Sequence, residues 1–261
     1  MGPPLAATPD KGQSAALTHK RNMAVTRRAS SLKGHPMKNV WTFTAVALCA
    51  AIFATPAAAR EDSQLWTGAT ATVKLDPKWR ISQELIGRFS DNRNGLYEVE
   101  AVTLLGYKLD SKVTLAGGYV HNPLYAAGEF TTMEHRAREQ VTVDNIAKIG
   151  GGSLSARLRL EQRWRENVDG TAWRMRPYLK YSHPLVGKTS LTLSSEAFVN
   201  LKRTPFQKVN GLDRFRNLVA VNVPLSKQLN VEAGYLNQYG IVRGGPDNID
   251  HVASVSLSLS L

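Results

Sequence analysis

Arginine alternates with apolar residues in LSARLRLEQRWRE, residues 154–166. Arg157, Arg159 and Arg163 each adjoin a leucine or a tryptophan. Neighbouring residues of a β-strand point to opposite faces, so one face of this segment would be apolar and the other would carry guanidinium groups. Clustered guanidinium groups can bind carboxylates or phosphates, either within the protein or on a ligand. The direction in which these arginines point therefore decides what they could do.

The histidines and serines give weaker evidence for a metal site or a catalytic site. Of the six histidines, His121, His135, His183 and His251 fall in the part expected to fold. None has the close i, i+2 or i, i+4 partner that metal ligation would favour, so no metal or other cofactor is predicted. Ser254 is the nearest candidate nucleophile to His251, but residues three apart on a strand face opposite sides. We therefore predict no catalytic residues.

The charge of the 261-residue chain is unevenly distributed. The formal net charge is +12, from 33 Lys+Arg and 21 Asp+Glu. Residues 1–59 hold seven of the basic residues and one acid, which leaves 26 − 20 = +6 for the rest. That remainder contains no run of five or six like charges, so a nucleic-acid partner is not expected.

A secretory signal peptide is predicted near the N-terminus. Lys38 precedes the apolar run 40–54, which is followed by Pro56 and the small-residue triplet 57–59. A basic flank, a short apolar core and an A-x-A ending are typical of a cleaved signal, and the run is short for a membrane-spanning helix. The single cysteine, Cys49, lies inside the apolar run, so the exported chain would contain no disulfide.

Cleavage after Ala59 gives the predicted organisation of the chain. A lipoprotein anchor at Cys49 is the alternative, but Leu48 is bulky for such a site. The expected parts are a disordered or over-called extension at 1–36, a signal peptide at 37–59 and a folded domain at 60–261.

Period-two alternation recurs throughout the folded part. Eleven candidate strands are 64–74, 79–89, 97–108, 112–121, 133–144, 154–166, 173–183, 189–200, 215–224, 229–238 and 252–261. Many are long enough to cross a bilayer at a tilt. Only helices and closed barrels satisfy every backbone group in lipid, so an all-β, antiparallel transmembrane β-barrel of about 10–12 strands is predicted.

The predicted connections alternate between short and long. Short ones include 75–78 and 225–228, and long ones include 122–132 and 202–215. Outer-membrane barrels have short periplasmic turns and longer outer loops, and single-chain bacterial barrels have even strand numbers. Eleven candidates therefore suggest ten or twelve strands, with twelve slightly favoured.

The alternation also predicts which face meets lipid. Leu158 and Leu160 would face outward and the intervening arginines inward, and the ending VSLSLSL divides leucine from serine in the same way. Aromatic residues near strand ends would form outward-facing interfacial girdles. They are Trp66, Trp79, Tyr97, Tyr107, Tyr119, Trp164, Trp173, Tyr181 and Tyr235.

Several segments in order resemble a known family. SQLWTGATATVKLDPKWRISQELIGRFSD, SARLRLEQRWRE, WRMRPYLKYSHPL and VEAGYLNQY are similar to the bacterial outer-membrane barrels of domain-of-unknown-function family 2490. The resemblance covers roughly residues 63–261. It implies a barrel in the outer membrane, and it supplies no catalytic residues to carry over. One departure is the final Leu261, where barrel strands commonly end in an aromatic residue read by the assembly machinery.

Charged residues expected inside the barrel are the candidate site. The predicted lumen set comprises Glu84, Glu98, Glu100, Arg157, Arg159, Glu161, Arg163, Arg174, Arg176, Lys180, Glu196 and Glu232. One interpretation is a salt-bridged network that fills a narrow barrel. The other is a porin-like, anion-preferring pore lined by Arg157, Arg159, Arg163, Arg174 and Arg176.

The sequence thus predicts an outer-membrane barrel of a Gram-negative bacterium, with a structural or interaction role and no catalytic activity. The alternative is a small anion pore, and a lesser alternative is a lipid-modifying enzyme. Expected partners are outer-membrane lipid, the barrel assembly machinery and small anionic solutes. Lipopolysaccharide could bind the basic connection 201–216, which we expect to face outward.

Overall fold

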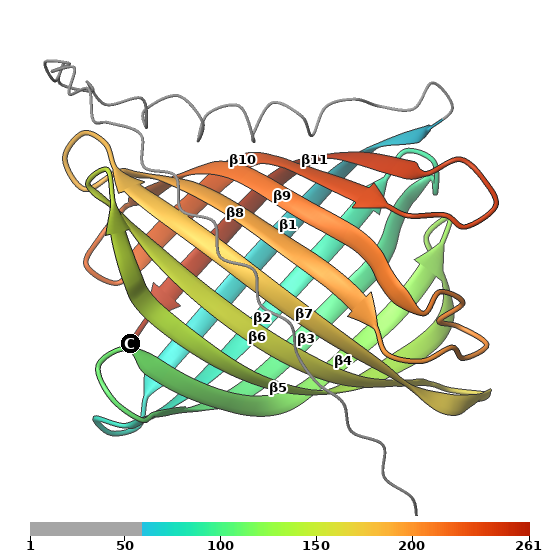
Figure 1. Ribbon diagram of the computed structural model, residues 1–261, viewed down its shortest axis with the longest axis horizontal. Coiled ribbons are helices and arrows are strands. Elements are labelled where there is room, and N and C mark those ends of the chain that lie inside the picture. Colours follow the sequence, from blue (N-terminus) through green and yellow to red (C-terminus); the bar gives the residue numbers. More distant parts are fainter. Residues whose placement is uncertain (1–58) are drawn as a thin grey trace, which may run out of the picture. The chain divides into compact units, whose positions relative to one another are not determined.

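The computed structural model describes residues 59–261, which form eleven strands and no helix. The strands slant around a barrel (Figure 1) and are β1 (Arg60–Lys74), β2 (Trp79–Ser90), β3 (Gly95–Lys108), β4 (Val113–Ala126), β5 (Glu129–Ile149), β6 (Gly152–Arg165), β7 (Val168–Pro184), β8 (Ser190–Asn200), β9 (Gly211–Pro224), β10 (Leu229–Gly240) and β11 (Asn248–Ser260). Among the described residues, no helix is long and apolar enough to cross a membrane. The predicted extension at 1–36 and the predicted signal peptide, apart from its last residue, lie outside the described part of the chain.

A parallel pair of strands closes the barrel. Each strand pairs antiparallel with the next along the chain, and β1 pairs in parallel with β11. This pair extends from Arg60 opposite Asn248 to Thr72 opposite Ser260. The all-β barrel is confirmed, but it has eleven strands rather than the ten or twelve that parity favoured. An odd number can close because the first and last strands run in the same direction, so segment 64–74 belongs to the wall.

The connections distinguish the two ends of the barrel. At the turn end they are 75–78, 109–112, 150–151, 185–189 and 225–228. At the loop end they are 91–94, 127–128 and 166–167, together with the longer segments 201–210 and 241–247. The contrast is less regular than predicted, because β4 and β5 continue to a tight turn within the predicted loop 122–132. In that turn Ala127 and Gly128 have φ values of 50° and 83°.

The outer face of the wall is apolar. In β6, Leu158 is 46% exposed, whereas the adjacent Arg159 is only 7% exposed. The predicted orientation, with leucines outward and arginines inward, is therefore confirmed for this strand. Exposed apolar residues on other strands include Leu85, Leu105, Leu179, Val219 and Leu257.

A small apolar cluster lies inside the barrel, where the first and last strands of the described residues meet. Trp66, Leu236 and Val252 form it, and Leu218 packs against it. Trp66 and Tyr97 were expected in the outer aromatic girdles, but both are buried. The indole N–H of Trp66 and the hydroxyl of Tyr97 each donate to Oε1 of Gln64, at 2.8 Å in both cases. These hydrogen bonds allow both rings to lie inside.

Glycine permits close approach of the wall strands at two positions. A Cβ added to Gly118 in β4 would lie 1.9 Å from the carbonyl oxygen of Thr103. A Cβ at Gly234 in β10 would lie 2.2 Å from the carbonyl oxygen of Val219. Glycine at such sites allows a sheet to bend sharply, as a narrow barrel requires.

Candidate functional site: the charged interior

Ion pairs link the inner wall from β2 to β8. The arginine–glutamate network is defined here as the inward-facing arginines and glutamates that pair with one another: Arg88, Glu98, Glu100, Glu134, Arg136, Arg138, Arg157, Glu161, Arg163, Arg165, Arg174, Arg176 and Glu196. Strand alternation brings these side chains to one face. Because the strands are neighbours in a closed barrel, they face one another across a short distance.

Glu161 connects three arginines in the middle of the network. Its side chain is fully buried. Its carboxylate lies 2.9 Å from Nη2 of Arg138, 2.6 Å from Nη2 of Arg174 and 2.8 Å from Nη1 of Arg176. A buried carboxylate requires such partners, since desolvation otherwise disfavours its charge. This residue therefore ties β5, β6 and β7 together from the inside.

Glu134 has the same role nearer the loop end. Its fully buried carboxylate lies 2.7 Å from Nε of Arg136, 2.8 Å from Nη2 of Arg163 and 2.7 Å from Nε of Arg165. Two of the partners come from the neighbouring strand β6. Each carboxylate oxygen can accept two hydrogen bonds, so little acceptor capacity remains for further cations.

Glu98 and Glu100 extend the network across β4. Nη2 of Arg88 in β2 lies 2.8 Å from Glu100. From β5, Arg136 lies 3.0 Å from Glu98 and Arg138 lies 3.1 Å from Glu100. Because β3 and β5 are separated by β4, these contacts join strands that share no backbone hydrogen bonds.

The network contains more cations than anions. It has eight arginines and five glutamates, so the formal surplus is 8 − 5 = +3. Two further inward arginines, Arg159 and Arg216, form no ion pair with any carboxylate in residues 59–261. Their Nε atoms donate instead to Gln140, at 2.9 Å, and to Gln238, at 2.7 Å. The interior is therefore electropositive.

Aromatic faces accommodate part of this surplus. The guanidinium carbons of Arg88 and Arg216 lie 4.4 and 4.5 Å from the ring centroid of Trp66. Arg176 and Arg216 lie 4.3 and 4.5 Å from the ring of Phe198. A cation over an aromatic face is attracted to the electron-rich ring. The buried Trp66 and Phe198 thus act as neutral partners for Arg216, and they add to the ion pairs that Arg88 and Arg176 already make.

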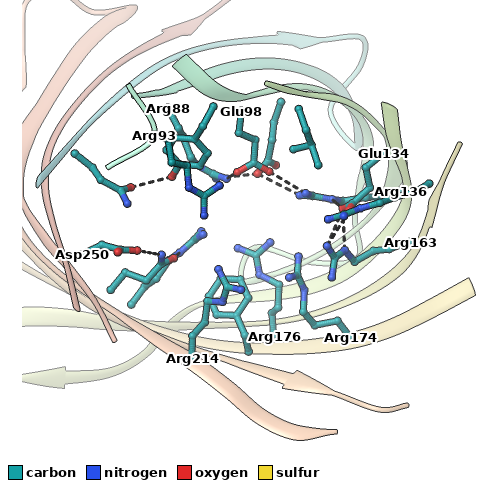
Figure 2. Close-up of a pocket in the computed structure, with 18 residues that line it drawn as sticks. Arg88, Arg93, Glu98, Glu134, Arg136, Arg163, Arg174, Arg176, Arg214 and Asp250 are labelled. Carbon is teal, nitrogen blue, oxygen red and sulfur yellow. Dashed lines mark hydrogen bonds and ion pairs between the residues drawn. The ribbon is translucent and has the colours of Figure 1, made fainter. Parts of the chain in front are cut away.

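Side chains divide the lumen into separate cavities. The loop-end cavity (Figure 2) has a volume of about 190 Å³. The mid-barrel cavity has a volume of about 290 Å³. Arg88, Glu100, Arg176 and Arg216 line both, so they lie between them. The arrangement narrows the lumen with paired and stacked charges.

The connection between β8 and β9 folds over the loop end. Gln207 is only 3% exposed, and its Nε2 donates to the carbonyl oxygens of Trp173, at 3.0 Å, and Lys202, at 2.8 Å. Its Oε1 accepts a hydrogen bond of 3.1 Å from Nη1 of Arg163. The ring of Phe206 lies 4.9 Å from the guanidinium carbon of Arg165. This segment partly covers the cations of the network.

Most of the predicted lumen residues come together in the structure. Glu98, Glu100, Arg157, Glu161, Arg163, Arg174, Arg176 and Glu196 belong to the network. Arg159 is buried beside it. Glu84 and Lys180 are half-buried and line the mid-barrel cavity and a turn-end cavity of about 540 Å³. Glu232 is half-buried opposite Asn222 and Ser256.

Other members of the interior were missed by sequence reasoning. They are Arg88, Glu134, Arg136, Arg138, Arg165, Arg214 and Arg216. EHRARE, residues 134–139, has the same alternation as residues 157–163 and could have revealed three of them. Arg214 and Arg216 were assigned to an outward-facing basic connection. That assignment is wrong, because both lie in β9 and line the loop-end cavity.

The candidate metal ligands and the candidate nucleophile do not come together in the described residues. Within residues 59–261, no three side chains of His, Cys, Asp or Glu are placed to hold a metal ion. His251 and Ser254 face opposite sides of β11. Nδ1 of His251 shares a 2.7 Å hydrogen bond with the hydroxyl of Tyr235, whereas Ser254 lines the mid-barrel cavity.

Fold and interior together define a closed β-barrel with an apolar outer wall and an ion-paired, electropositive lumen. The chain belongs to the family described as "Protein of unknown function (DUF2490)", whose profile matches residues 63–249. An uncharacterized protein of Methylorubrum extorquens is 27% identical over 205 residues, which cover 76% of this chain and 87% of that relative. No solved structure matches the chain.

Proposed function

We propose that this protein is an integral β-barrel of the bacterial outer membrane, without catalytic activity, whose structural or interaction role depends on a closed, ion-paired lumen. The apolar outer wall supports the membrane location. Leu85, Leu158 and Leu257, from well-separated strands, are 54%, 46% and 45% exposed. A water-soluble barrel would expose these leucines at a free-energy cost proportional to their area, whereas acyl chains would cover them.

Outward-facing aromatic groups support the same location. Towards the turn end, Trp79 and Tyr107 have ring centroids 4.8 Å apart. Towards the loop end, the rings of His135 and Trp164 stack at 6.0 Å, and Tyr119 hydrogen-bonds to His135. Aromatic side chains with polar groups favour the two membrane–water interfaces, so the two clusters fit the edges of an apolar band.

The division of the lumen carries the proposal for a closed interior. Arg88, Glu100, Arg176 and Arg216 lie between the loop-end and mid-barrel cavities. Opening this region to ions would require buried pairs to separate, and breaking such a pair is strongly unfavourable. The expected resting state therefore conducts no steady current.

Planar-bilayer recording tests this proposal. Purified protein should show heat-modifiable gel mobility, which demonstrates a folded barrel, and should insert without steady conductance. Inner- and outer-membrane fractionation of cells should place it in the outer membrane. Steady current through the folded protein would contradict the closed lumen, and recovery as a soluble periplasmic species would contradict the membrane location.

The electropositive interior favours a second candidate, a small anion-preferring pore. Its cations exceed its carboxylates, and rings of arginine favour anions. This candidate predicts a steady anion-selective current that falls when Arg157 and Arg159 are replaced by alanine. Replacing Lys227 with alanine would be the control, because this exposed turn residue lines neither the mid-barrel nor the turn-end cavity.

Export, assembly and the lack of catalysis require separate tests. N-terminal sequencing of the outer-membrane form should find Arg60 first if the predicted signal is cleaved after Ala59. Depletion of the barrel assembly machinery should reduce the folded fraction. Lipase and deacylase assays across lipid classes should be negative, and a reproducible turnover would support the lipid-modifying alternative.

A further inference from the structure

We propose that the loop-end cavity is a binding site for a polyvalent oxyanion, with a phosphate group as the chemical class. The inference concerns a bound ligand and goes beyond the structural role proposed above. Nine arginines and four carboxylates line the cavity, which gives a formal surplus of 9 − 4 = +5. Its volume of about 190 Å³ suits a phosphate group with a few waters, since each water occupies about 30 Å³ in the liquid.

The carboxylates around the cavity are already engaged. Glu134 accepts from three arginines, and Glu98 and Glu100 lie on Arg88 and Arg136. The fourth carboxylate, Asp250, accepts from the side-chain amide of Gln238. The surplus cations therefore cannot be neutralised by rearranging the existing pairs. An additional anion would supply the acceptors that the wall lacks.

Arg216 supplies free donors at this site. Its Nε donates to Gln238, and its guanidinium lies between the rings of Trp66 and Phe198, 4.5 Å from each centroid. Neither terminal nitrogen of Arg216 is paired with a carboxylate among residues 59–261. Contact with both rings restricts the guanidinium group, so less side-chain freedom is lost when an oxyanion binds.

Other cations converge on the same space from different strands. Figure 2 shows Arg174, Arg176 and Arg214 projecting into the cavity from one side, with Arg93 across from them. Arg174 and Arg176 share the carboxylate of Glu161. Arginines from opposite walls can therefore contact different oxygens of one tetrahedral group, which favours phosphate over a monovalent halide.

A route for the anion exists at the loop end. A mouth cavity of about 620 Å³ shares Arg93 and Arg214 with the loop-end cavity. Six cations and three carboxylates line this mouth. An electropositive entrance raises the local concentration of anions. The phosphate group could belong to a free solute or to a lipid headgroup, since both have the same oxygens.

Calorimetric titration of the full-length protein in detergent with inorganic phosphate tests the proposal. We expect saturable binding, weakened at least about tenfold by Arg216→Gln, because one charge-assisted hydrogen-bonding group is lost. Arg93→Gln is a second variant, at an exposed turn residue that forms no ion pair within residues 59–261 and lies over the ring of Tyr97. Lys180→Gln, an inward cation outside this cavity, should bind phosphate like the original protein. Heat-modifiable mobility verifies that each variant is folded.

Competition then distinguishes the source of the phosphate group. Phosphatidylcholine vesicles with phosphatidic acid should compete with inorganic phosphate if the site takes a lipid headgroup, and vesicles without it should not. No competition from either vesicle would identify a free solute. The proposal would be overturned if phosphate binding is not saturable, or if the folded Arg216→Gln and Arg93→Gln variants bind phosphate as tightly as the original protein. Conductance is measured separately, so a pore would refute the closed lumen without affecting this result.

Discussion

The two halves of the inner wall hold the barrel together by different interactions. Strands β2 to β8 carry the arginine–glutamate network. Strands β9, β10, β11 and β1 present an apolar cluster around Trp66 and small residues such as Ser256 and Gly68. The strands of the first half follow one another as antiparallel hairpins, whereas the second half contains the parallel closure between the ends of the domain. Charge pairs thus link the strands of the first half across the lumen, and small side chains allow the seam strands to approach closely.

Close contact at the seam accounts for its small residues. A Cβ at Gly68 of β1 would lie 3.3 Å from Cβ of Ser256 in β11. Long charged side chains would not fit between these strands without displacing one another. The charged half also has a close approach, at Gly118, but its long side chains reach across intervening strands to their partners. The comparison predicts that the two halves respond differently to substitution.

The largest effect is expected for Glu161→Gln in the charged half. The change leaves Arg138, Arg174 and Arg176 without their shared carboxylate. Removing one partner of a buried ion pair costs about 3–5 kcal/mol, because the remaining charges are uncompensated. The free energy of unfolding, from denaturant titration in detergent, should fall by this amount. Glu84→Gln is the matched control, since Glu84 is half-buried and has no ion pair within the described residues. Equal losses for both variants would show that the network has no special role.

A smaller loss is expected for Leu236→Ala in the seam half. Leu236 is 9% exposed and packs with Trp66 and Val252. Truncation should lower the free energy of unfolding by about 2 kcal/mol, at the low end for buried leucine because the cluster is small. Leu236→Met should retain most of the stability, since it conserves volume. The same denaturant titration measures both, and a greater loss than for Glu161→Gln would reverse the comparison.

Glu139 offers a test of the outer wall. It is exposed on β5, opposite Gly117 of β4 and Leu160 of β6, on the face that we propose meets lipid. Glu139→Leu should stabilise the barrel in bilayers by about 1 kcal/mol, because a carboxylate on a lipid-facing wall is unfavourable. Glu129→Leu, at the start of β5 near the loop end, should have little effect. Destabilisation by Glu139→Leu would argue that this position contacts water or a polar partner.

The smallest effect is expected in the turns and loops between strands. In each half, an aspartate there accepts hydrogen bonds from nearby donors. Hydrogen bonds from the hydroxyl of Tyr239 and the backbone N–H of Val242 lower the pKa of Asp247, beside the seam. Backbone N–H groups of Lys112 and Val113 lower the pKa of Asp110, in the charged half. A lowered folded-state pKa stabilises the fold above the unfolded pKa of about 3.9, and this contribution is lost as the pH falls through the folded value. The protection of the Val242 and Val113 amides from hydrogen exchange, measured relative to the intrinsic exchange rate at each pH, should therefore fall in acid, and Asp247→Asn or Asp110→Asn should remove most of that dependence at its own site. An unchanged pH dependence in these variants would contradict the assigned cause.

Strand alternation, read from the sequence alone, predicted which face of the wall many residues take. Alternation in residues 154–166 was sufficient to orient Leu158 and Arg159, because strand geometry fixes which face each residue takes. The same alternation, in residues 154–166 and 173–183, identified Glu161 and Arg176 as interior charges. Applied to EHRARE, the same rule would have added Glu134, but the charges of that strand were overlooked.

The closure of the barrel and the pairing of interior side chains could not be predicted from strand alternation. The parallel pairing of β1 with β11 joins residues almost 190 positions apart, such as Arg60 and Asn248, and no local signal specifies it. Trp66 contacts Arg88 of the adjacent strand β2 and Arg216 of β9, and the second contact joins strands that are distant in the sequence. The cavities depend on how several side chains share one space, which spacing alone does not reveal.

Spin labels on adjacent residues of β11 test the central claim, that this wall separates hydrocarbon from a polar lumen, most directly. Leu257 is 45% exposed on the outer face, and Ser256 lines the mid-barrel cavity. In bilayers, with Cys49 replaced by serine, a label at Leu257→Cys should collide readily with oxygen, which concentrates in hydrocarbon, and one at Ser256→Cys should not. A label at 257 that is accessible to a water-soluble nickel complex, together with oxygen access at 256, would contradict the account.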